Sequence, residues 1–110
     1  MTADEHHSSK YVINYFRKAK LEYERLDGSQ KVFVNKGLAR ISRLGMQAGQ
    51  PLKGDLSLCR KLKNKKMGLR IVFTQDGEKI NVIQIVAIGQ RADKIVYRDA
   101  AQRLRKNKLD

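Results

Sequence analysis

The spacing of the apolar residues changes from a helical period to a strand period in the middle of the chain, and this change limits the fold more than any other feature. Between residues 16 and 44 the apolar residues recur at helical spacing, with charged residues between them. Over residues 58–74 they alternate with other residues, as in strands that bury one face. The segment 46–55, which holds the only proline, is expected to be a loop between the two regions. The pattern predicts an α+β domain in which a helical region precedes most of the sheet.

Individual elements follow from the same pattern. Residues 10–16 are rich in aromatic and β-branched side chains and predict a first strand. Helices are expected over 16–26 and 30–45, joined by the turn at 27–29 into an antiparallel hairpin. We expect Ser29 to cap the second of these helices and Gly45 to end it.

The second half of the chain predicts a three-strand meander and a last helix. The strands are expected over 58–63, 69–74 and 80–89, with Leu58 and Leu62 facing the helices. Asp76-Gly77 is a typical hairpin turn between the last two strands. Asp93 is expected to cap a helix over 94–106. The fold class is therefore α+β with two layers in the order β-α-α-β-β-β-α: a helical hairpin packed on a small, mainly antiparallel sheet, followed by a C-terminal helix.

Domain organisation, location and metal binding are also addressed by the sequence. One domain is expected over 10–110, preceded by a flexible polar tail at 1–9. The two histidines, His6 and His7, are adjacent in that tail, so neither a metal site nor a cofactor is expected. No apolar run approaches a membrane span, and the N-terminus has no signal core, so we expect a cytoplasmic protein with no membrane partner. The single Cys59 agrees with a reducing compartment.

The charge of the chain indicates its kind of partner. The formal net charge is +13, from 24 lysines and arginines against 11 acidic residues. Such an excess repels itself and is most easily understood if the protein binds a polyanion. Nucleic acid is the leading candidate, and an acidic protein is a second that is compatible with the first.

Five side chains from separate segments are candidates for one site. Lys61 and Lys63 lie two residues apart in a predicted strand and therefore project from the same face. Arg70 on the next strand can share that face, Arg91 follows the central strand, and Tyr97 lies early in the last helix. A lysine has a reference pKa of about 10.4, and neighbouring cations lower it. Crowding these cations would thus favour a neutral lysine that can accept a proton.

Each candidate also has an ordinary structural explanation. The lysines within 61–66 can be a solvated strand face, which is what exposed lysines usually are. Arg91 can pair with Asp93 or Asp99, and Tyr97 can be a half-buried helix residue. A basic face alone is a weak signal for catalysis and a fair one for phosphate binding.

Two motifs give the chain a resemblance to a known family. "CRKLKNKKMGLRIVF" contains Lys-x-Lys followed by an arginine seven residues after the second lysine, and "IGQRADKIVYRDAAQRL" contains Gly-x-Arg followed six residues later by a tyrosine. Residues 58–104 resemble the RelE family of ribosome-dependent mRNA endonucleases within the RelE/ParE toxin–antitoxin superfamily. Residues 11–57 agree in the order of elements more than in residue types. Arg60 and Leu69 stand where the family has tyrosines, which affects the expected codon preference more than the chemistry.

The resemblance implies roles for the five candidates. Lys63 would be the general base, Lys61 and Arg70 would hold the phosphate, Arg91 would stabilise or protonate the leaving group, and Tyr97 would orient the nucleotide. The reaction would be metal-independent attack by the 2′-hydroxyl on mRNA in the ribosomal A site, and translation would be inhibited. Further cations are expected to bind RNA or the ribosome: Arg60, Lys65, Lys66, Arg98, Arg103 and Arg105.

The resemblance also implies partners and leaves two alternatives. Besides mRNA and the ribosome, the implied partner is a cognate acidic antitoxin that covers the basic surface or moves the last helix. One alternative is a ParE-like toxin directed at gyrase, although such chains usually lack this set of five residues. The other is a basic RNA- or ribosome-binding module without catalysis.

Overall fold

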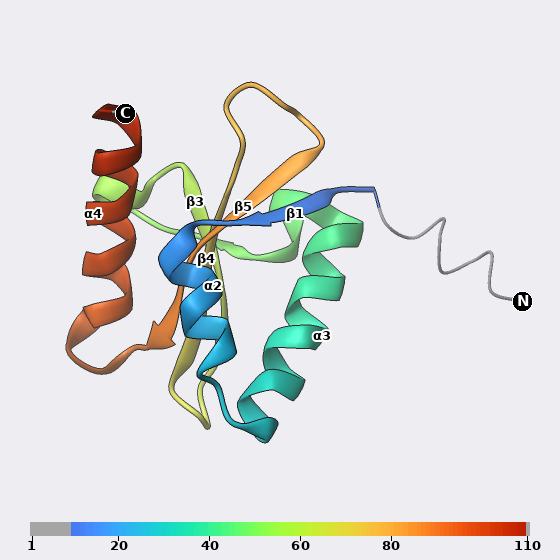
Figure 1. The fold of residues 1–110 in the computed structure, drawn as a ribbon, viewed down its shortest axis with the longest axis vertical. Coiled ribbons are helices and arrows are strands. Elements are labelled where there is room, and N and C mark those ends of the chain that lie inside the picture. The colour runs from blue at the N-terminus through green and yellow to red at the C-terminus, as the bar shows by residue number, and fades with distance from the viewer. Residues whose placement is uncertain (1–9, 110) are drawn as a thin grey trace, which may run out of the picture.

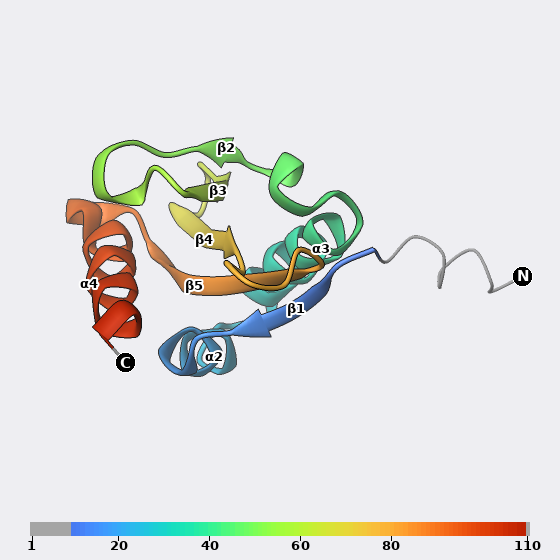
Figure 2. The ribbon, with the colours of Figure 1, turned by 90° about the horizontal axis from the view of Figure 1, so that it is seen from above.

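The computed structural model describes residues 10–109, and these form a five-stranded mixed sheet with helices on both faces (Figures 1 and 2). The strand order is β1-β5-β4-β3-β2; β1 runs parallel to β5, and all other neighbours are antiparallel. The strands are β1 (Val12–Tyr15), β2 (Gln50–Pro51), β3 (Cys59–Asn64), β4 (Leu69–Gln75) and β5 (Val82–Gln90). The α-helices are α2 (Arg17–Glu24), α3 (Gly28–Leu44) and α4 (Ile95–Leu109), and the short 3₁₀ helices are η1 (Gly45–Ala48), η2 (Gly54–Leu56) and η3 (Ala92–Lys94).

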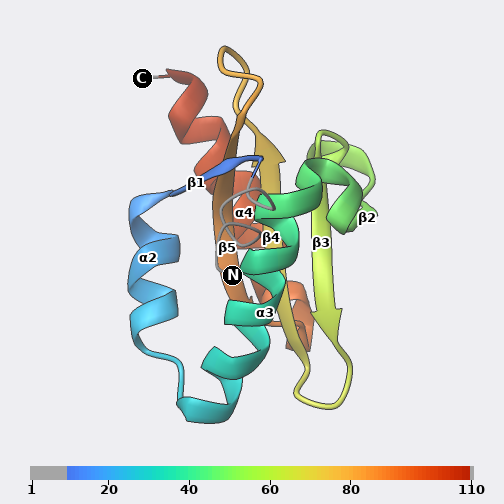
Figure 3. The same ribbon diagram turned by 90° about the vertical axis from the view of Figure 1, so that its right-hand side faces the viewer.

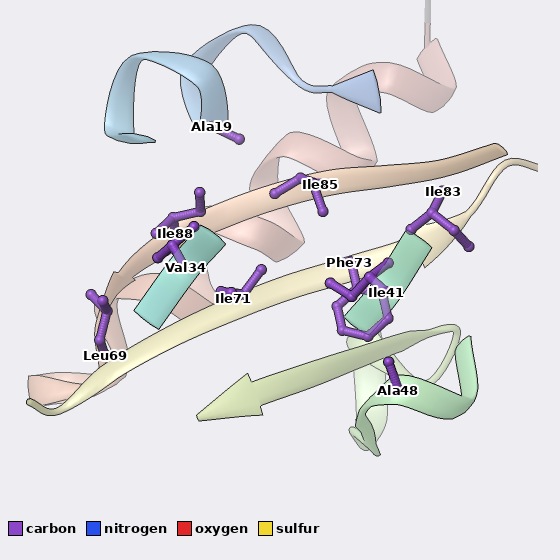
Figure 4. Packing of buried hydrophobic residues seen from close by; sticks show 10 residues of the cluster. All are labelled: Ala19, Val34, Ile41, Ala48, Leu69, Ile71, Phe73, Ile83, Ile85 and Ile88. Carbon is purple, nitrogen blue, oxygen red and sulfur yellow. The ribbon is translucent and has the colours of Figure 1, made fainter. Parts of the chain in front are cut away.

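The main core lies between the sheet and the hairpin formed by α2 and α3. Leu69, Ile71 and Phe73 of β4 point to this side because alternate strand residues share a face (Figure 4). Val34 and Ile41 of α3 meet them at helical spacing and are fully buried. The predicted α+β class, with a helical hairpin on a mainly antiparallel sheet and a C-terminal helix, is confirmed.

A second, smaller core lies on the opposite face, where α4 covers the sheet (Figure 3). Val72 of β4 and Val86 of β5 are buried there against Val96 and Ala100 of α4. The register between β4 and β5 shifts between Val72 and Phe73, which marks a bulge that leaves Val86 without a direct partner. The last helix thus forms a layer of its own rather than joining the hairpin.

The start and the end of α3 have clear local causes. Asp27 is its N-cap: the carboxylate accepts a hydrogen bond from the Gln30 N–H at 2.8 Å, and the Gln30 side chain accepts one from the Asp27 N–H. The prediction that Ser29 caps this helix is wrong, because the Ser29 hydroxyl instead donates to Asp27. The predicted stop at Gly45 is confirmed: its φ is +62°, and a Cβ there would lie 2.6 Å from the Tyr11 ring.

Several local expectations need correction. β3 begins at Cys59, one residue later than expected. Leu58 is 74% exposed and does not face the helices, whereas Cys59 is buried. The expected loop at 46–55 includes the short strand β2. By contrast, the hairpin predicted at Asp76-Gly77 is confirmed: β4 and β5 are antiparallel neighbours joined by residues 76–81, where the Asp76 carboxylate accepts bonds from the N–H groups of Glu78 and Lys79.

The expected flexible tail at 1–9, with His6 and His7, lies outside the described residues, and so does the side chain of the predicted cap Asp93. Within 10–109, no helix is both long and apolar enough to cross a membrane.

Candidate active site

A basic hollow of about 530 Å³ lies beside the turn between β3 and β4. Five of its lining side chains are cations, and they come from β3, from the turn after it, from β4 and from the segment that follows β5. This basic hollow is lined by Lys61, Lys63, Lys65, Gly68, Arg70, Gln90, Arg91 and Ala92.

Strand register explains why cations distant in sequence meet here. Lys63 of β3 pairs across the ladder with Arg70 of β4, which pairs in turn with Gly89 of β5. Directly paired residues project from the same face, so the lysines and Arg70 point to the same side of the sheet. Arg91 is held close by its own backbone: its N–H donates to the carbonyl of Gly68 at 2.8 Å. The structure therefore brings Lys61, Lys63, Arg70 and Arg91 together.

Arg70 is the most buried of these cations. Only 5% of the residue is exposed, and its Nη1 donates to the carbonyl of Leu69 at 3.1 Å. Its Nε is buried and has no hydrogen-bond partner among the described residues. A buried guanidinium with an unused donor is costly alone but suits an anion that enters the hollow.

The electrostatics of the hollow act most clearly on Lys63. The pKa of Lys63 lies below its ordinary value because of the positive charge of Lys65, followed by partial loss of solvent and the charges of Lys61, Arg70 and Arg91. Like charges disfavour the protonated amine, so a larger fraction of Lys63 is neutral at a given pH than for an isolated lysine.

Tyr97 borders the basic hollow rather than lining it. It lies in the first turn of α4, and the Nζ of Lys61 is 5.8 Å from the centre of its ring. The residue is half-buried, as a structural helix residue would be, but its hydroxyl is buried without a hydrogen-bond partner within residues 10–109. What Tyr97 offers to the site is therefore an aromatic face next to a cation.

The other predicted RNA-binding cations do not form one group. Lys65 lines the basic hollow, Lys66 is exposed in the same turn, and Arg98 is exposed near the start of α4. Arg60 alternates with Lys61 and therefore lies on the other face of β3, where its Nη1 donates to the carbonyl of Gly49 at 3.2 Å.

The remaining two predicted cations lie on α4 and are paired with acids. Arg103 forms a bidentate ion pair with Glu22 of α2, and Arg105 lies 3.9 Å from Asp55. Asp99, one of the alternative partners considered for Arg91, lies 3.8 Å from Arg103 instead.

Sequence analysis missed Gln90 as a lining residue. Gln90 is the last residue of β5 and pairs with Leu69 across the ladder, which places it directly beside the turn. Its position between Gly89 and Arg91 in the second motif was the available signal. Within the part of the chain that the structure describes, no three His, Cys, Asp or Glu side chains are grouped so that they could hold a metal ion.

Comparisons with known proteins identify the fold. No protein-family model matches the chain, and no curated protein matches its sequence. Among solved structures, a mutant of the E. coli toxin RelE in the free state superposes with a TM-score of 0.72 at 24% identity, over 86% of this chain and 98% of that one. The M. tuberculosis toxin–antitoxin complex RelBE2 gives 0.61 at 18% identity, over 74% and 99%. The intact E. coli RelBE toxin–antitoxin complex gives 0.61 at 23%, over 73% and 95%.

Proposed function

We propose that this chain is the toxin of a type II toxin–antitoxin module, because it has the fold of RelE toxins and a hollow lined by cations. Its activity is that of a ribosome-dependent, metal-independent endoribonuclease that cuts mRNA in the A-site codon and thereby inhibits translation. The observation that carries this proposal is the convergence of Lys61, Lys63, Arg70 and Arg91 on one hollow, in which the pKa of Lys63 is lowered. The lowered pKa makes the amine of Lys63 a more available proton acceptor than that of an isolated lysine.

RNA supplies its own nucleophile, and the side chains of the basic hollow supply the rest of the reaction. Neutral Lys63 takes the proton of the 2′-hydroxyl, whose oxygen attacks the adjacent phosphorus. Lys61 and the unused donor of Arg70 stabilise the negative charge that builds up on the phosphorane. The bond from phosphorus to the 5′-oxygen then breaks, and this oxygen leaves beside Arg91 and takes a proton from water; the proton held by Lys63 returns to the solvent. The products are a 2′,3′-cyclic phosphate and a 5′-hydroxyl.

Tyr97 orients the nucleotide in this scheme. Its hydroxyl is buried, and its ring lies near Lys61. The ring face is therefore the part of Tyr97 that a base or sugar can contact. Positioning of this kind lowers the barrier by holding the 2′-oxygen in line with the scissile bond. The ribosome contributes the other half of the geometry, since it presents a single-stranded codon in a fixed shape.

An acidic antitoxin is the proposed partner that holds the toxin inactive. The net charge of +13 favours an acidic protein segment on the same surface that attracts RNA. Solved structures with this fold include complexes of RelE-type toxins with their antitoxins, which supports such a partner. A toxin that acts on ribosomes would work in the cytoplasm.

The proposal is tested with purified protein and ribosomes that hold a defined message. We expect cleavage within the A-site codon, mapped by primer extension, and no cleavage when the scissile nucleotide carries a 2′-deoxyribose. Lys63→Ala should lower the single-turnover rate on the order of 10²–10⁴-fold, and Arg91→Ala on the order of 10²–10³-fold. Lys36→Ala, which removes the same charge from the exposed face of α3, should cut at the wild-type rate.

The same assay separates the two alternatives. Salt-sensitive binding of RNA without any cut by the wild-type protein indicates a binding module. An intact message together with stalled gyrase indicates a gyrase-directed toxin. Either result would refute the proposed activity.

A further inference from the structure

An ion pair outside the basic hollow connects α4 to α2. Nη1 and Nη2 of Arg103 on α4 donate to the two carboxylate oxygens of Glu22 on α2, at 2.8 and 2.7 Å. The two side chains are only 13% and 25% exposed. A bidentate pair shielded in this way holds both its partners in one geometry, unlike an exposed pair.

The same two side chains also bind the backbone of β5. β1 runs beside β5 only along Val82–Ile85, so that side of β5 has no strand neighbour farther along. The N–H of Ile88 donates to the Glu22 carboxylate at 3.0 Å, and Nη1 of Arg103 donates to the carbonyl of Val86 at 2.9 Å. The pair therefore forms hydrogen bonds with backbone groups of β5 that have no neighbouring strand on that side, and it connects α2, β5 and α4.

Besides this pair, α4 is held by the smaller of the two cores. Among the side chains of α4 whose burial the structure describes, Val96 and Ala100 are buried, and both are small and offer little apolar area; Tyr97, Ala101 and Leu104 are only partly buried. Tyr97 lies six residues before Arg103, about 9 Å along the helix axis. A helix is stiff over this length, so whatever fixes Arg103 also limits how α4 slides or rotates at Tyr97.

We infer that Glu22 and Arg103 are a positioning pair that holds α4 so that the Tyr97 ring stays beside Lys61 at the basic hollow. The inference rests on the proposed function, in which Tyr97 orients the nucleotide. It gives Arg103 a different role from the RNA contact expected from the sequence, because its guanidinium is already bound to a carboxylate and a carbonyl.

A double-mutant cycle between Arg103 and Tyr97 tests this on the ribosome. Arg103→Ala should slow the single-turnover rate on the order of 10- to 100-fold with little change in the half-saturating ribosome concentration, because it misplaces a group that orients the substrate. In the Tyr97→Ala background the same substitution should have almost no further effect. Equal losses in both backgrounds, or a salt-dependent loss of affinity alone, would overturn the inference. Lys106→Ala, which removes a nearby exposed cation of α4, is the matched control.

A second measurement does not depend on cleavage. Because Lys61 Nζ lies 5.8 Å from the centre of the Tyr97 ring, we expect the ring to shift the NMR signals of the Lys61 side-chain protons, and this shift should shrink in Arg103→Ala but persist in Lys106→Ala. If Arg103→Ala does not fold, Glu22→Gln replaces it, since its amide oxygen can still accept the Ile88 N–H while the charge is lost. An unchanged Lys61 shift in the folded variant contradicts the positioning role. A wild-type protein that cuts no RNA refutes the proposed function, and the NMR result then decides the placement of Tyr97 by itself.

Discussion

Lys65 makes the largest contribution to the lowered pKa of Lys63, although the resemblance gave it only a part in binding RNA. Lys63 lies near the end of β3 and Lys65 begins the turn that follows, and both line the basic hollow. Lys61, Arg70 and Arg91 act in the same direction with smaller effects. The repulsion among these cations is thus concentrated on the residue proposed as the base, where it favours the neutral amine.

Removing the charge of Lys65 should therefore move the pH dependence of cleavage. The base acts when it is neutral, so the rate rises with pH through the pKa of Lys63. Lys65→Gln raises this pKa, which shifts the rising limb to higher pH and lowers the rate at neutral pH, while the rates converge in strong alkali.

Single-turnover rates measured across neutral and alkaline pH would check this, with ribosome concentration kept saturating. Lys65→Arg keeps the charge and should leave the limb in the wild-type position. A shift to lower pH in Lys65→Gln, or none at all, would show that Lys65 does not tune the base.

At the scale of elements, the position of β3 depends on a close approach by the segment between α3 and β2. Gly49 lies so near to β3 that a Cβ there would be 2.6 Å from the carbonyl oxygen of Lys61 and 2.7 Å from the Phe73 ring. The contact with a backbone atom cannot be relieved by a change of rotamer. Only glycine lets this segment pack against the strand that carries Lys61 and Lys63.

Gly49→Ala should consequently lower the free energy of unfolding by about 1–3 kcal/mol, as overpacking does elsewhere in protein cores. Gly28→Ala is a matched control, because a Cβ at Gly28 in the first turn of α3 meets nothing within 4 Å. That substitution should raise the free energy of unfolding by up to about 1 kcal/mol. Urea unfolding followed by circular dichroism measures both, and equal effects of the two substitutions would contradict the close approach.

Across the whole molecule, charge is distributed unevenly between the two ends of β4. Arg70 at its start belongs to the basic hollow, whereas Thr74 and Gln75 at its end border a larger, mainly apolar hollow of about 610 Å³, in which Arg105 is offset by Asp55 and Asp76. An RNA that approaches this molecule is attracted to the end with the lysines. The uneven charge thus helps to orient the protein before contact.

The salt dependence of RNA binding should report on this end alone. With a 2′-deoxy oligonucleotide that cannot be cut, Arg91→Gln should reduce the slope of log affinity against log salt by about 0.7–1, the share of one phosphate contact. Lys36→Gln, on the exposed face of α3, should leave the slope unchanged. Titrations at several salt concentrations measure it, and equal slopes for all three proteins would mean that the basic hollow does not contact the phosphates.

The sequence by itself determined the elements and most of their faces, because these depend on neighbours in the chain. Helical spacing in α3 and alternation in β4 each reflect which side of an element meets the core, and a glycine with positive φ ends α3 at Gly45. The alternation also placed Lys61 and Lys63 on a common face, and the motifs selected Arg70, Arg91 and Tyr97 to join them.

The tertiary structure decided what depends on contacts between distant segments. Sequence spacing does not give the register that sets Lys63 opposite Arg70, nor the bond from the Arg91 N–H to Gly68 that draws the two segments together. Arg103 looked like any other cation of a basic helix until Glu22, 81 residues away in the chain, was found to hold it. The exposure of Leu58 was equally hidden, because whether an apolar residue at a strand end is buried depends on what packs over it.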